Sequence, residues 1–63
     1  MTYRELNDLF FKTWADDRGI IRGKPVTLIY RMNQLAGKDG MDSVVDESIL
    51  AAELKEANLT LAK

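Results

Sequence analysis

The chain of 63 residues contains no cysteine and no histidine. Disulfide bonds are therefore excluded, and so is a structural zinc site built from the usual cysteine and histidine ligands. A catalytic triad or a general base that uses histidine is excluded as well. Because the lack of cysteine fits a reducing compartment, we expect a cytoplasmic protein, and nothing in the sequence predicts a cofactor.

Long apolar runs are also absent. No uninterrupted apolar stretch approaches the roughly 20 residues that a membrane-spanning helix needs. Met1 leads directly into polar residues, whereas a targeting signal has a basic start followed by an apolar run. We therefore expect no membrane partner, and a single small domain over residues 1–63, because 63 residues leave room for only one.

Charge is unevenly distributed, although the net charge is only −1. Residues 1–17 hold two basic and four acidic side chains, a net charge of −2, and residues 39–63 hold two basic and six acidic ones, a net charge of −4. Residues 18–38 hold five basic side chains and no acid, a net charge of +5. This basic segment and one tyrosine within it provide the candidate contact residues for a partner: Arg18, Arg22, Lys24, Tyr30, Arg31 and Lys38.

A first helix is predicted over about residues 2–17. Thr2 and Glu5 have the spacing of a capping box, in which each side chain binds the backbone N–H of the other residue. Apolar side chains recur at helical spacing and predict one buried face, formed by Tyr3, Leu6, Leu9, Phe10, Thr13 and Trp14. We expect Trp14 to belong to the core, because aromatic residues at helical spacing usually pack inside.

The segment 26–30 is rich in β-branched and aromatic residues, so a strand there is an alternative to a helix. Helical spacing fits better, and it predicts a buried arc of Leu28, Ile29, Met32, Leu35 and Ala36. Pro25 suits the first position of a helix and Gly37 suits its end. A second helix is therefore predicted over about residues 25–36.

A third helix is predicted over about residues 43–61, with Ser43 or Asp46 as its cap. Two apolar seams run along it, one of Leu50, Leu54, Ala57 and Leu61, the other of Val45, Ile49, Ala52 and Leu59. Because Glu56 interrupts the second seam, we expect the first to be the drier one. Burying both seams needs neighbours on two sides, which predicts either a homodimer through helix 43–61 or coverage of both seams by the other two helices.

Together these elements predict an all-α fold, a small three-helix bundle or helical array. The helix, connector and helix over the first half resemble a helix-turn-helix, but the connector is longer than the usual turn of about 3–4 residues. The basic segment has two further interpretations: it complements the protein's own acidic third helix, or it meets an acidic partner.

Two short motifs resemble known families. The stretch Gly40–Val44 resembles the attachment site of acyl and peptidyl carrier proteins, which implies a phosphopantetheine arm on Ser43 at a helix N-terminus. Carrier domains need further helices after that serine, and only 20 residues follow Ser43. The alternative interpretation of the stretch is a loop that ends in a serine cap.

The stretch Trp14–Ile20, followed by Gly23–Pro25, is similar to the start of MazG-type nucleoside triphosphate pyrophosphohydrolases. The resemblance implies magnesium held by paired glutamates from two helices. This chain has one such pair, Glu53 and Glu56, and no acid between Pro25 and Asp39, where that family places its main acidic cluster. The alternative interpretation of the two glutamates is a solvated helix edge.

The sequence thus favours a small non-enzymatic interaction or regulatory protein that binds a macromolecule, with a protein as the expected partner. The alternative is a nucleic-acid-binding regulator that uses residues 18–38, although a pI of 5.2 is lower than such proteins usually have. A degenerate pyrophosphohydrolase-like helical protein is the third possibility.

Overall fold

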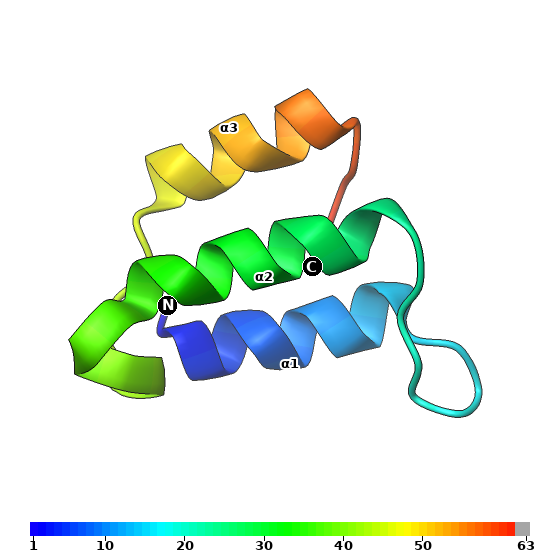
Figure 1. Ribbon diagram of the computed structural model, residues 1–63, viewed down its shortest axis with the longest axis horizontal. Helices are drawn as coiled ribbons and strands as arrows, with labels where there is room; N and C mark the ends of the chain where they lie inside the picture. The colour runs from blue at the N-terminus through cyan, green and yellow to red at the C-terminus, as the bar shows by residue number, and fades with distance from the viewer. Residues whose placement is uncertain (62–63) are drawn as a thin grey trace.

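The computed structural model describes residues 1–61 and is all-α, as predicted. Its helices are α1 (Tyr3–Trp14), α2 (Lys24–Ala36) and α3 (Glu47–Ala57), with a 3₁₀-helix, η1 (Gly37–Asp42), between α2 and α3. Successive α-helices run in opposite directions, and α2 lies between the other two (Figure 1). No Cα atom of α1 lies within 8 Å of one of α3. Of the two predicted arrangements, the fold is therefore an open helical array.

The core lies where α2 meets α1 and α3. Phe10, Leu6 and Met32 are fully enclosed. The other buried side chains complete one cluster: Tyr3, Leu28, Ala36, Val45 and Leu50. On α1 and α2 the buried positions recur every three or four residues, which confirms the helical spacing found in the sequence.

Some residues expected on the buried faces of α1 and α2 are only partly enclosed or exposed: Leu9, Thr13, Trp14, Ile29 and Leu35. Trp14 packs against the core and stacks on Phe10, with the ring centroids 5.4 Å apart, but its side chain is only half-buried. Leu35 is 50% exposed, because α2 turns this position away from α1. The predicted buried arc of α2 is therefore narrower than the sequence suggests.

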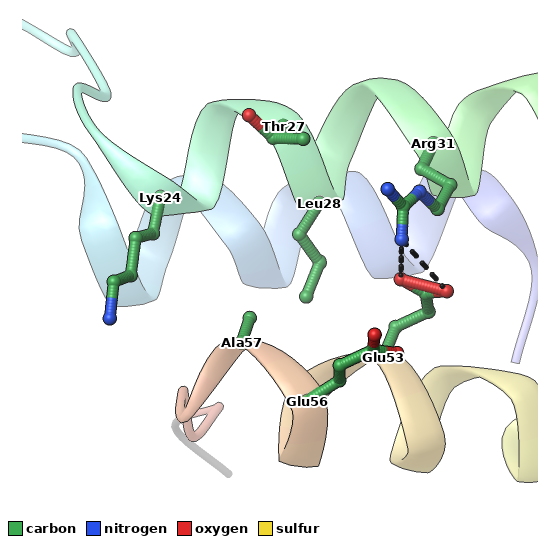
Figure 2. Close-up of a pocket in the computed structure, with 7 residues that line it drawn as sticks. All are labelled: Lys24, Thr27, Leu28, Arg31, Glu53, Glu56 and Ala57. Atoms are coloured by element: carbon green, nitrogen blue, oxygen red, sulfur yellow. Dashed lines mark hydrogen bonds and ion pairs between the residues drawn. The ribbon is translucent and has the colours of Figure 1, made fainter.

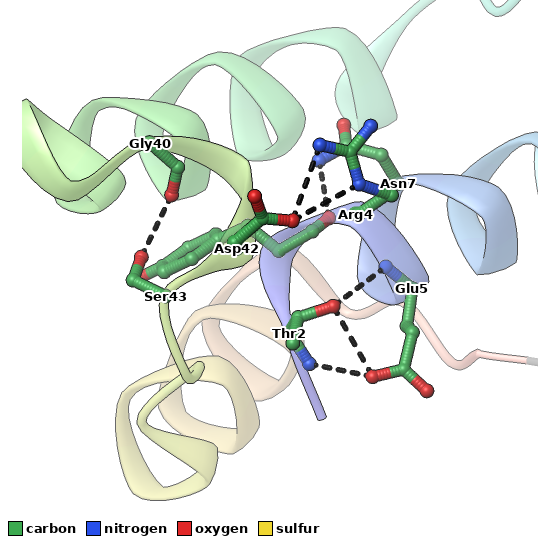
Figure 3. A network of polar contacts seen from close by, with 8 residues as sticks. Thr2, Arg4, Glu5, Asn7, Gly40, Asp42 and Ser43 are labelled. Atoms are coloured by element: carbon green, nitrogen blue, oxygen red, sulfur yellow. Dashed lines mark hydrogen bonds and ion pairs between the residues drawn. The ribbon is translucent and has the colours of Figure 1, made fainter.

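The capping box at the start of α1 is confirmed (Figure 3). The Thr2 backbone N–H donates to Glu5 Oε1 at 2.9 Å, and the Glu5 N–H donates to Thr2 Oγ1 at 3.3 Å. The bonds to the Glu5 carboxylate from the Thr2 backbone N–H and then from the Thr2 hydroxyl lower the pKa of Glu5 below its ordinary value of 4.5. These bonds satisfy N–H groups that the first turn of the helix cannot pair.

The end of α1 differs from the prediction, since the helix stops at Trp14 and not near Asp17. Asp16 causes the early stop. Its carboxylate accepts hydrogen bonds from the backbone N–H of Arg18 at 2.8 Å and of Ile20 at 3.0 Å. Gly19 then takes a left-handed conformation with φ of 77°, which suits glycine. A local turn thus replaces the last predicted helical turn.

The helical interpretation of residues 26–30 is correct, because all five lie within α2. Pro25 occupies the first turn, and Gly37 ends the helix with a positive φ of 56°. η1 follows directly, where a loop was expected.

The start of α3 corrects the predicted boundary at residue 43. Ser43 is extended, and Val44 forms an isolated antiparallel bridge with Thr2. The Tyr3 N–H donates to the Ser43 carbonyl at 3.1 Å, and the Val45 N–H donates to the Met1 carbonyl at 2.8 Å. Asp46 then caps α3, as one of the two predicted caps, through bonds from the Ser48 and Ile49 N–H groups.

The end of α3 also differs, since the helix stops at Ala57 and not near residue 61. Asn58 adopts a left-handed conformation with φ of 59°, and its N–H bonds to the Leu54 and Lys55 carbonyls. The chain then turns back, and Leu59 and Leu61 pack against the core. This C-terminal segment contributes apolar side chains without extending the helix.

The first predicted seam is the drier one only within α3 itself. In the first seam, Leu50 is buried, and Leu54 and Ala57 pack against the core. In the second seam, Ile49 and Ala52 are exposed within α3, but Val45 before the helix is buried and Leu59 after it packs against the core. None of the helices in the described part of the chain combines the length and the apolar character that crossing a membrane requires.

Candidate functional site

The six predicted contact residues are all exposed, but the fold does not gather them into one surface. Arg18 and Arg22 lie in the connector before α2, and Lys24 is the first residue of α2. Lys38 lies in η1, beyond the opposite end of that helix. Because α2 has 13 residues, these two groups are separated by about 20 Å along its axis. The basic segment is therefore not one continuous stripe.

Lys24 and Arg31 line a cleft of 350 Å³ between α2 and α3 together with Glu53 and Glu56, and Arg31 forms an ion pair there (Figure 2). Arg31 Nη1 donates to both carboxylate oxygens of Glu53, at 2.8 and 3.4 Å. The Glu53 side chain is only 19% exposed, so the pair is partly shielded from water. For Arg31, the interpretation that the basic segment complements the acidic third helix is thus correct.

The glutamates singled out by the pyrophosphohydrolase resemblance both line this α2–α3 cleft. Glu53 binds Arg31, and Lys24 lies on the same wall as Arg31 (Figure 2). Within residues 1–61, no three acidic side chains come together as a metal-binding group. Magnesium needs several oxygen ligands, so the residues around this cleft do not fit the magnesium site that the resemblance implies.

Ser43 does not lie where a carrier-protein serine would. It follows η1, and three residues separate it from the start of α3 at Glu47. Its hydroxyl donates to the Gly40 carbonyl at 2.8 Å (Figure 3). The alternative of a loop serine is therefore correct, although the residue that caps α3 is Asp46.

The feature that sequence reasoning missed is an apolar hollow between α1, α2 and the connector. We call it the α1/α2 hollow. It has a volume of 260 Å³ and is lined by Phe11, Gly19, Ile21, Val26 and Ile29. Phe11 remains 54% exposed and Val26 47% exposed. The adjacent Phe10 and Phe11 were the available signal, because only one of two consecutive helical residues faces the core.

The connector also carries two arginines next in sequence to residues that line the α1/α2 hollow. Gly19 and Ile21 belong to its wall, and Arg18 and Arg22 are their neighbours in sequence. Among the described residues the ion pairs are Arg4–Asp42 and Arg31–Glu53, so neither connector arginine is paired there. The connector beside this hollow therefore holds two exposed arginines without an ion-pair partner among residues 1–61.

A second apolar surface, which we call the leucine groove, lies between α1, α3 and the C-terminal segment. It has a volume of 880 Å³. Half of the residues that line it are leucines, and one acid and one lysine also line it: Met1, Leu9, Glu47, Leu50, Ala51, Leu54, Lys55, Leu59, Thr60 and Leu61. The groove exists because α1 and α3 each pack on α2 and not on each other.

The chain matches no protein-family model, and no curated protein or solved structure matches it at a significant level of similarity.

Proposed function

We propose that this chain is a small non-enzymatic interaction module that binds a partner protein through the α1/α2 hollow. The observation that carries the proposal is Phe11, a large aromatic side chain left 54% exposed beside a hollow with apolar walls. In water such a surface is unfavourable, and its burial against a partner is favourable. Exposed apolar patches with a polar rim are typical of protein-binding sites.

The partner that fits this surface inserts an apolar side chain between Phe11 and Val26 and carries acidic residues beside it. Val26 and Ile29 hold one side of the hollow on a rigid helix, and Ile21 holds another through the connector. The unpaired guanidinium groups of Arg18 and Arg22 orient an acidic flank and increase the association rate. The apolar contact supplies most of the affinity in this proposal, because exposed ion pairs contribute little.

Nucleic acid is the second candidate, favoured by the three cations Arg18, Arg22 and Lys24 at one end of α2. Arg31 is bound to Glu53, and Lys38 lies at the other end of the helix. With about three phosphate contacts, the slope of log K against log salt on duplex DNA would be only about −3. A pI of 5.2 also fits a protein partner better.

The test compares capture by the immobilised wild-type chain with capture by Phe11→Ser and Val26→Ser, from lysate with and without nuclease. Leu35→Ser is the matched control, because Leu35 is 50% exposed on the same helix as Val26 but lies about 180° around its axis. Circular dichroism establishes that each variant is folded.

We expect the wild-type chain to capture a protein with or without nuclease treatment. Leu35→Ser should still capture that protein, and Phe11→Ser should not. Titration of that purified partner should then show weaker binding to Arg22→Glu. Equal capture by Phe11→Ser would remove the α1/α2 hollow from the interface. Loss of capture on nuclease treatment would favour the nucleic-acid alternative.

A further inference from the structure

A different face of the molecule, the leucine groove, supports a second interaction. We infer that α3 pairs in antiparallel orientation with α3 of a second copy of this chain, across a two-fold axis at Ala51. The pairing covers the leucine groove and leaves the α1/α2 hollow free. It goes beyond the proposed function and stands or falls separately from it.

The first observation is the apolar character of the leucine groove. Leu9 lines it from α1, Leu54 from α3 and Leu61 from the C-terminal segment. With a volume of 880 Å³ it is larger than the α1/α2 hollow. A groove of this size between two helices accepts a third helix, since helices pack about 8–10 Å apart.

The second observation is the charge at the edge of the leucine groove, and it identifies the occupant. Glu47 and Lys55 both line the groove, four residues before and four residues after Ala51. Each therefore lies about 6 Å from Ala51 along the helix axis, in opposite directions. When two copies of α3 pair in antiparallel orientation about Ala51, each Glu47 faces the partner's Lys55. Both contacts are attractive, so this edge is complementary to itself.

Neither of these charged side chains has an ion-pair partner in the described part of its own chain. A two-fold interface needs such self-complementarity, because the same patch serves both subunits. An unrelated partner helix would have no reason to require opposite charges at equal distances from one small residue.

The third observation is the size of the residue at the proposed axis. Ala51 is exposed and lines the leucine groove. A small side chain at the crossing point lets two helices approach closely, and the neighbouring Leu54 of each copy then packs into the partner's groove. The pairing thus combines apolar contact at its centre with ion pairs at its edge, the usual organisation of a protein interface.

The first experiment is sedimentation of the full chain over a range of micromolar concentrations. We expect a reversible shift from the 7.1 kDa monomer to a species of twice that mass. Ala51→Glu should raise the dissociation constant by about 100-fold or more, because it places two like charges together at the axis. Ala52→Glu is the matched control, since Ala52 is exposed on the same helix but does not line the groove.

The second experiment is a charge exchange across the axis. Glu47→Lys and Lys55→Glu should each weaken dimerisation by about tenfold, since two attractive contacts become repulsive. The double variant Glu47→Lys/Lys55→Glu should restore it. In the double variant the lysine lies near the N-terminus of α3 and the glutamate near its C-terminus, and both positions are unfavourable for the helix dipole. The exchange therefore does not stabilise the monomer, and a recovery of dimerisation reports the contacts across the axis.

Three outcomes would overturn the inference. The wild-type chain remains monomeric at every concentration, or Ala51→Glu dimerises as well as Ala52→Glu, or the double charge exchange fails to recover association. Phe11→Ser should leave the dimer unchanged, so a failure of the proposed function and a failure of this inference give different results. Circular dichroism of Ala51→Glu, at an exposed position, checks that the monomer is folded.

Discussion

A reciprocal pair of asparagines fixes α1 against α2, and its removal gives a prediction whose magnitude can be estimated from the structure. Asn7 Nδ2 donates to Asn33 Oδ1 at 2.8 Å, and Asn33 Nδ2 donates to Asn7 Oδ1 at 3.0 Å. Each amide also donates to the carbonyl four residues earlier in its own helix, at Tyr3 and Ile29. Both side chains are half-buried, so water competes only in part for these bonds.

The energy of the pair follows from its two mutual hydrogen bonds. Each contributes about 1 kcal/mol net, so we expect a coupling free energy of about 1–2 kcal/mol between Asn7 and Asn33. Each single change to alanine leaves the other amide without its cross-helix partner, and the double change removes both. In a domain of this size, about 1 kcal/mol shifts the melting temperature by about 4–8 °C.

The assay is a double-mutant cycle of Asn7→Ala and Asn33→Ala, with unfolding followed by circular dichroism in denaturant. The control cycle pairs Asn7→Ala with Gln34→Ala, because Gln34 is exposed on α2 and bonds only to the Tyr30 hydroxyl. That control should show no coupling. A coupling of less than about 0.3 kcal/mol in the asparagine cycle, within ordinary additivity, would refute the reasoning.

Three further predictions concern the ends of the helices. Thr2→Ala should lower the free energy of unfolding by about 1 kcal/mol through loss of the cap on α1, and an unchanged denaturation midpoint would contradict it. Because the folded state lowers the pKa of Glu5 below 4.5, its contribution to stability is present above that pH and disappears as the pH falls through the lower value. Thr2→Ala keeps the backbone N–H bond to Glu5 and removes only the hydroxyl bond, so its acid titration should show a smaller part of this decline. An acid profile identical to that of the wild type would show that the Thr2 hydroxyl does not contribute to the shift. Asn58 has a φ of 59°, so Asn58→Ala should lower the free energy of unfolding by about 1 kcal/mol, whereas Asn58→Gly should leave it unchanged or raise it. Equal unfolding curves for the two variants would show that the left-handed cap is not required.

Much of the helix plan could be predicted from the sequence because its determinants are local. The capping box requires only Thr2 and Glu5, which lie within one turn of each other. Pro25 and Gly37 mark the limits of α2, and helical spacing between them distinguishes helix from strand over residues 26–30. Each of these signals acts within a few residues, so distant contacts do not change it.

The boundaries of α3 could not be predicted because distant residues determine them. Ser43 and Asp46 are equally good caps by residue type, and the bridge between Thr2 and Val44 decides in favour of Asp46. At the other end, Leu61 continues the helical spacing of the first seam although it lies beyond the helix. An apolar residue that packs on the same core after a turn has the same spacing in the sequence as one that lies on the helix. The apolar spacing therefore does not show where α3 ends.

The basic segment shows most clearly why charge in a sequence does not locate a site. Its five cations are close in sequence, but α2 separates them in space. Arg31 faces α3 and binds Glu53, whereas Arg18 and Arg22 lie in the connector that supplies Gly19 and Ile21 to the wall of the α1/α2 hollow. Lys38 lies beyond the far end of the helix. A phosphate backbone needs cations along one continuous path, and this fold provides cations at separate places with different neighbours. In the function we propose, the two connector arginines therefore contact an acidic protein surface, because the basic segment does not form one path along which a nucleic acid can lie.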